Sequence, residues 1–95
     1  MDIHDIELAQ DIIDIITQEG WEEVFSDRDN ITFKVLGADP YSNHVIKIEE
    51  DGDAILVREI EDGEIFAQVI AETYAWDESL DEVRTLVENA SGGIY

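Results

Sequence analysis

The sequence predicts a single α+β domain spanning residues 1–95: an N-terminal helix, an antiparallel sheet of four to five strands forming a hairpin meander, and a C-terminal helix or helix pair packed on the sheet. Three observations support this fold class. Apolar residues recur with helical spacing near both ends of the chain, β-rich segments alternate with polar turns between them, and two Asp-Gly pairs mark tight hairpins. A chain of 95 residues with 44% hydrophobic content suffices for one core and not for two.

Residues 4–19 predict the first helix. At 100° per residue its polar side chains gather on one arc, and Gly20 follows where a helix commonly ends in a glycine. The opposite arc is apolar and consists of Ile6, Leu8, Ala9, Ile12, Ile13, Ile15 and Ile16.

Two hairpins are expected next. The first pairs "WEEVF" with "ITFKV" across the polar turn "SDRDN", and the loop "LGADPYSN" follows it. The second pairs "HVIKIEE" with "AILVREIE" across Asp51-Gly52, a dipeptide that accepts the positive φ angles of a two-residue turn.

The segment 64–76 is ambiguous, because Asp62-Gly63 invites another hairpin strand while the apolar residues behind it also recur with helical spacing. The last helix is clearer. Ser79 and Glu82 form a capping-box pattern, and Gly92 and Gly93 end the helix. Its apolar face consists of Leu80, Val83, Leu86, Val87 and Ala90.

The aromatic residues are predicted from their elements. Those in regular segments are expected in the core, whereas Tyr41 in the loop and Tyr95 at the terminus are expected to be exposed. The expected core aromatics are Phe25, Phe33, Phe66, Tyr74 and Trp76.

The most specific property of the chain is its net charge of -20, from 25 acids and five cations. Direct binding to DNA or RNA needs a basic surface, and anionic lipid headgroups repel an acidic one, so neither nucleic acid nor membrane is an expected partner. The absence of cysteine and of a signal-peptide pattern in "MDIHDIELAQ" favours a cytoplasmic location.

Catalytic patterns are sparse, and we expect no enzyme, no cofactor and no metal site. His4 and His44 lack metal-ligand spacing and are expected on the surface. No serine lies in a motif that activates a hydroxyl. The stretches "DGD" and "DRDN" lack the glycine and glutamate that complete a calcium loop, and both are interpreted as turns.

The charge itself suggests a function. Residues 1–27 and 59–83 contain no lysine or arginine, and each stretch holds nine acids. Acids three or four residues apart on a helix lie about 4.5–6 Å apart along the axis, comparable to phosphates along a nucleic-acid strand. Such a surface can occupy a cationic groove meant for DNA or RNA and release the same counterions. We therefore predict a basic, nucleic-acid-handling protein as the partner. The predicted partner-facing acids are Glu7, Asp11, Asp14, Glu49, Glu50, Asp51, Asp53, Glu61, Asp62 and Glu64.

The stretches "ITFKVLGADPYSN" and "VIKIEEDGDAILVREIEDGE", combined with the order of elements and the acidity, resemble the small acidic anti-CRISPR and anti-restriction proteins of phages. The nearest type is the anti-CRISPR family of Listeria prophages that blocks a DNA-cleaving CRISPR nuclease. This resemblance implies an inhibitor that binds the DNA-entry site of a nuclease through carboxylates in loops and turns.

Two other interpretations remain open. Adaptation to multimolar salt would also give an acidic, lysine-poor surface, although the 14 isoleucines against seven valines and five leucines fit that view less well. An immunity protein, antitoxin or secretion chaperone would bind a basic toxin or effector, with charge for fast association and an apolar centre for affinity. An exposed Trp21, Tyr41 or Trp76 within the acidic field would favour this class. The oligomeric state is left open.

Overall fold

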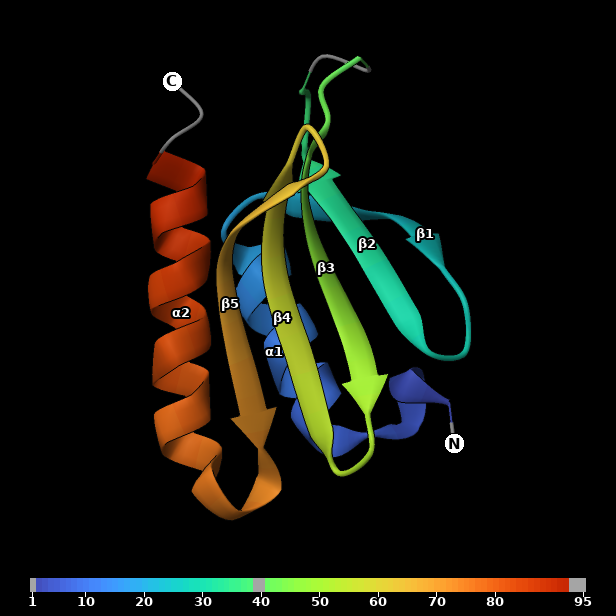
Figure 1. The fold of residues 1–95 in the computed structure, drawn as a ribbon, viewed down its shortest axis with the longest axis vertical. Helices are drawn as coiled ribbons and strands as arrows, with labels where there is room; N and C mark the ends of the chain where they lie inside the picture. The colour runs from blue at the N-terminus through green and yellow to red at the C-terminus, as the bar shows by residue number, and fades with distance from the viewer. Residues whose placement is uncertain (1, 39–40, 93–95) are drawn as a thin grey trace.

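The computed structural model describes residues 2–38 and 41–92, which form an α+β domain (Figure 1). The predicted fold class is confirmed: an N-terminal helix, a five-stranded antiparallel sheet and a C-terminal helix that packs on the sheet. The elements are η1 (Ile3–Asp5), α1 (Glu7–Gln18), β1 (Trp21–Ser26), β2 (Asn30–Val35), β3 (His44–Asp51), β4 (Ala54–Glu61), β5 (Glu64–Glu72), η2 (Thr73–Ala75) and α2 (Trp76–Gly92).

The sheet is a meander in which each strand pairs with the next, in the order β1-β2-β3-β4-β5. Both predicted hairpins are present, but only the β4–β5 turn is centred on its Asp-Gly pair. Gly52 has a φ of 62° in the β3–β4 turn, and Asp62 and Gly63 have φ angles of 52° and 83° in the β4–β5 turn. Asp62 and Gly63 are the two central residues of the β4–β5 turn, and Asp-Gly suits their left-handed conformations. In the β3–β4 turn Asp51 still pairs with Ala54 as the last residue of β3, so the central residues are Gly52 and Asp53, one residue later than predicted. The two turns lie at opposite ends of the sheet (Figure 1).

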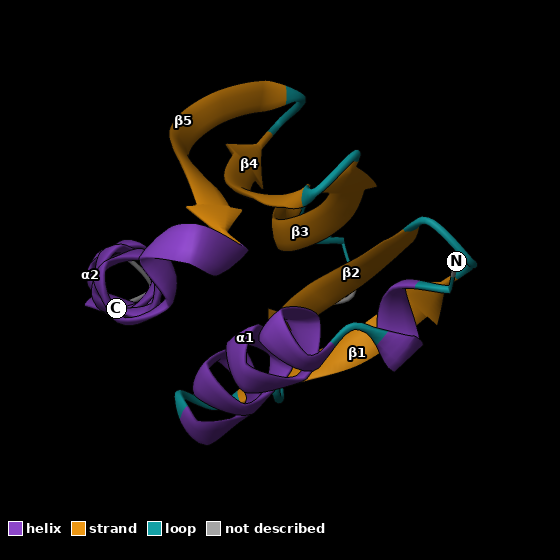
Figure 2. Ribbon diagram, turned by 90° about the horizontal axis from the view of Figure 1, so that it is seen from below, coloured by secondary structure: helices purple, strands orange, loops and turns teal. Residues whose placement is uncertain are grey.

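Both helices lie on the same side of the sheet, α1 behind its middle strands and α2 alongside β5 (Figure 2). Strand residues alternate in direction, so every second residue points at the helices. These inward residues form one apolar cluster with the helices, and this cluster is the core of the domain. The fully buried strand residues within it are Ile31, Phe33, Ile46, Ile48, Val57 and Ala71.

The ambiguous segment proves to be strand β5 followed by the single turn η2. Its register with β4 runs from Glu61↔Glu64 to Ala54↔Glu72, and Ala67, Val69 and Ala71 contact the core. The helical spacing arose because apolar residues also occupy the outward positions of this strand.

The C-terminal helix begins at Trp76, four residues before Leu80, where a capping box with Ser79 as its N-cap would have started it. Ser79 therefore lies within the helix and is not its N-cap residue. Its hydroxyl accepts a hydrogen bond from the Glu72 backbone N–H at 3.0 Å, so this buried serine ties α2 to the end of β5.

Three of the aromatic predictions are wrong. Phe25, Phe66 and Tyr74 are 57%, 61% and 86% exposed, whereas Phe33 is buried as expected. Trp76 is half-buried and packs against the core. Phe25 and Phe66 lie on strands of a sheet that the helices cover on one face only, and Tyr74 lies in η2, beyond the end of the sheet. Tyr41 is 89% exposed, as predicted, and Tyr95 lies outside the described residues.

Candidate functional site: an acidic cleft

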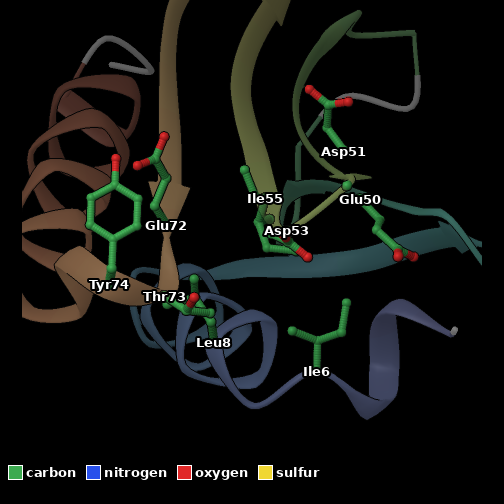
Figure 3. A pocket seen from close by; sticks show the side chains of 11 residues that line it. Ile6, Leu8, Glu50, Asp51, Asp53, Ile55, Glu72, Thr73 and Tyr74 are labelled. Atoms are coloured by element: carbon green, nitrogen blue, oxygen red, sulfur yellow. The ribbon is translucent and has the colours of Figure 1, made fainter.

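A cleft of about 550 Å³ opens at the end of the sheet where the β3–β4 turn, the end of β5 and the start of α1 meet (Figure 3). Segments far apart in the sequence line it. The lining residues are Ile6, Leu8, Glu50, Asp51, Gly52, Asp53, Ala54, Ile55, Glu72, Thr73 and Tyr74.

The lining combines acidic and apolar groups. Glu50, Asp51, Asp53 and Glu72 supply four carboxylates, and none of the described residues around the cleft is a lysine or arginine. Ile6, Leu8 and Ile55 contribute apolar surface. Figure 3 shows Glu72 and Tyr74 on one side of the cleft and Glu50 and Asp51 on the other. The cleft is therefore anionic, with an aromatic ring at its edge.

Backbone hydrogen bonds hold the two sides in place. The Glu50 N–H donates to the Asp29 carbonyl at 2.8 Å and so fixes the end of β3 to the β1–β2 turn. The Glu72 N–H donates to the Ser79 hydroxyl at 3.0 Å, which fixes the end of β5 to α2. Between them the tight turn at Gly52 leaves Asp51 and Asp53 exposed.

The predicted partner-facing acids do not form one surface. Only Glu50, Asp51 and Asp53 line the cleft. Glu49 points to the opposite face of the sheet, where its carboxylate lies 3.6 Å from the Arg58 guanidinium. The acids of the β4–β5 turn lie at the far end of the sheet, where they are exposed and Asp62 accepts a hydrogen bond of 3.5 Å from Asn43. These turn acids are Glu61, Asp62 and Glu64.

Sequence reasoning missed Glu72 and Tyr74. The signal for Glu72 was weak, because it is one acid among 25, and Tyr74 was assigned to the core. A strand assignment for 64–72 would have brought both beside the β3–β4 turn, because a hairpin meander returns the end of β5 to that edge of the sheet.

The acidic stripe on α1 divides into two kinds of residue. Glu7 and Asp14 are exposed. The Asp11 carboxylate instead accepts a hydrogen bond of 2.9 Å from the Trp76 indole N–H, and this bond joins α1 to the start of α2. Asp11 therefore has a structural contact that the other two acids lack.

This division predicts different effects of substitution. Asp11→Ala should lower the free energy of unfolding by about 1–2 kcal/mol, because the half-buried indole N–H loses its acceptor. Asp11→Asn keeps an acceptor oxygen and should cost less. Glu7→Ala and Asp14→Ala should change stability by less than about 0.5 kcal/mol or raise it, since each removes an exposed like charge. Urea unfolding of the four variants measures this, and equal losses at all three positions would refute the assignment.

The two histidines lie in different environments. At the N-terminus the His4 ring lies 2.7 Å from the Asp2 carboxylate, which raises the pKa of His4 above its usual value. The His4 backbone N–H and ring in turn lower the pKa of Asp2. The surface prediction is wrong for His44, whose side chain is only 13% exposed, because it packs edge-on against Trp21 and its ring lies 2.7 Å from Glu59.

Within residues 2–38 and 41–92 no group of three or more potential ligands is arranged to hold a metal ion. Over the same residues no helix is long and apolar enough to cross a membrane. Comparison of the chain with family models, with curated proteins and with solved structures finds no match.

Proposed function

We propose that this protein is a non-catalytic binding protein that captures a basic, nucleic-acid-handling protein, and that its acidic cleft takes a lysine or arginine side chain of that partner. The observation that carries the proposal is the composition of the cleft: four carboxylates beside an apolar surface, with no cation among the described lining residues.

A lysine or arginine side chain matches both parts of this lining. Its aliphatic stem can lie on Ile6, Leu8 and Ile55 while its charged head reaches the carboxylates. Hydrogen bonds between an ionised donor and an ionised acceptor are about twice as strong as neutral ones. Tyr74, 86% exposed at the edge, adds a ring face for a cation. No internal ion pair among the described lining residues would have to break first.

The net charge supports the same kind of partner. A charge of -20 accelerates encounter with a cationic protein, and apolar and aromatic contacts then slow dissociation. Tyr41 is 89% exposed, and Asn43, two residues further along the same loop, donates a hydrogen bond to Asp62 of the β4–β5 turn. A surface that combines carboxylates with exposed aromatic residues favours the binding mode expected of immunity proteins, antitoxins and secretion chaperones, in which charge speeds association and an apolar centre gives affinity.

A second mode, mimicry of nucleic-acid charge as in an anti-CRISPR or anti-restriction inhibitor, is supported by the acids outside the cleft. Glu7, Asp14, Glu61 and Glu64 are exposed and form no ion pair within the described residues. They remain available to an external row of cations. In this mode the carboxylates would act collectively, and no single cleft would dominate the affinity.

A peptide titration separates the two modes. The probe is a fluorescein-labelled arginine-rich peptide of about eight residues, and its anisotropy is followed at about 0.1 M and 0.3 M KCl. The double variant Asp53→Asn with Glu72→Gln alters the cleft, and Glu61→Gln with Glu64→Gln removes the same charge at the far end of the sheet.

We expect the cleft variant to weaken binding at least tenfold, the far-end variant by no more than about twofold, and Tyr74→Ala by several-fold. Equal losses from the two double variants, with no effect of Tyr74→Ala, would instead favour mimicry through distributed charge. Wild-type protein that is folded and binds no peptide at either salt concentration would overturn both modes.

A further inference from the structure

The outward side of the sheet, which we call the open face, has an ordered composition. Its central row takes one residue from each strand in turn: Phe25, Thr32, Lys47, Arg58 and Gln68. Apolar residues are interspersed with polar ones on either side of this row. Towards the β4–β5 turn lie Val45, Ile60 and Ile65 together with the pair Glu22 and Lys34, and towards the β3–β4 turn lie Asn30, Glu49, Leu56 and Ile70.

The open face has no helical layer over it in the described part of the chain. Figure 1 looks towards this side, and Figure 2 shows α1 and α2 on the other side of the sheet. Phe25, Ile65 and Ile70 are accordingly 57%, 56% and 48% exposed. An antiparallel sheet that has one solvated face normally places polar residues there, so these exposed apolar residues are unusual.

The charge of the open face differs from that of the whole chain. Lys34 pairs with Glu22 and so shares the face, which gives it three of the five cations of the protein. Among the described residues four acids lie there: Glu22 and Glu49 within the sheet, and Asp51 and Glu72 at its end, where they also line the cleft. The rest of the chain carries 21 acids and two cations. The open face is therefore close to neutral on a strongly anionic protein.

We propose that a second copy of this chain packs on the open face, so that the protein forms a two-fold symmetric dimer. Two copies with a charge of -20 each repel one another wherever acids meet, and the open face, with three cations and four acids among the described residues, is a surface on which that repulsion is small. The face is also self-complementary, because it carries apolar residues and charges of both signs: Lys47 and Arg58 of one copy can meet Glu49 of the other. A basic partner would be repelled by these same cations.

The area is consistent with a dimer. Five strands about 4.8 Å apart and about eight residues long cover roughly 24 by 26 Å, or about 600 Å² in projection. The accessible area of a side-chain surface exceeds its projection, and a standard interface buries about 800 Å² per partner.

Sedimentation equilibrium tests the proposal, from about 1 µM to about 500 µM protein at about 0.15 M and 1 M KCl. We expect a dimer whose dissociation constant falls as salt screens the repulsion between the two copies. Ile70→Glu should raise that constant at least tenfold, because it adds an acid to each copy of a nearly neutral face. Leu36→Glu makes the same charge change at a residue that is 67% exposed and lies after β2, outside the strands, and should change it by less than twofold.

Circular dichroism establishes that each variant is folded, and Phe25→Glu on β1 replaces Ile70→Glu if the latter does not fold. A wild-type protein that stays monomeric throughout would overturn the proposal and leave the open face to a different partner. A dimer weakened equally by Leu36→Glu and Ile70→Glu would also overturn it, because the contact would then lie elsewhere.

Discussion

Thermal unfolding of this protein is expected to be cooperative already at about 0.1 M KCl, and its Tm should rise by about 10–20 °C between 0.1 M and 1 M. Screening shortens the reach of surface charges from about 10 Å to about 3 Å over this range, which relieves the repulsion among 25 acids. Relief of about 2–3 kcal/mol corresponds to a shift of this size in a domain of under 100 residues. The core supplies the stability at low salt, because the helices and the inward side of the sheet share one continuous apolar cluster.

Circular dichroism at 222 nm measures the transition, and the double variant Glu7→Gln with Asp14→Asn is the matched control. It removes two exposed acids from α1 without touching the Asp11–Trp76 hydrogen bond. Its Tm should be higher than that of the wild type at 0.1 M and should respond less to salt. A wild-type chain that folds only in molar KCl would contradict the prediction, and its acidity would then be an adaptation to brine.

Local patterns predicted most of the fold because each had a local physical cause. The amphipathic arc of residues 4–19 determines α1. The left-handed angles that glycine and Asp-Gly accept determine the two tight turns, with Gly52 in one and Asp62 and Gly63 in the other. The segment 64–76 could not be assigned in this way. Apolar residues on both faces of β5 give the same spacing as one helical face, and only pairing with β4 distinguishes the two.

The candidate cleft was predictable only in part. The many acids near Gly52 suggested a partner-binding surface there. Strand alternation, however, turns Glu49 away from the cleft and Glu50 towards it. The return of β5 that adds Glu72 and Tyr74 is a property of the whole sheet. The structural role of Asp11 depends on Trp76, which lies 65 residues away and carries no local signal.

Phe33→Ala is expected to destabilise the protein far more than Phe66→Ala. Phe33 is fully buried and Phe66 is 61% exposed, so the same chemical change is made in two environments. Loss of a buried phenylalanine costs about 3–5 kcal/mol, a large share of the roughly 5–15 kcal/mol that stabilises a typical domain. Loss of the exposed ring should cost less than about 1 kcal/mol.

Because charge repulsion reduces the stability further, Phe33→Ala should be largely unfolded at about 0.1 M KCl and regain its circular dichroism signal towards 2 M. Phe66→Ala should remain folded at both concentrations. Urea and salt titrations at about 1 µM protein keep any self-association out of the comparison. If Phe66→Ala were destabilised as much as Phe33→Ala, the outward side of β5 would have to be covered in solution. If Phe33→Ala remained unfolded in molar salt, screening of the surface charge would be too weak to compensate for the loss of the buried ring, and the prediction would be wrong.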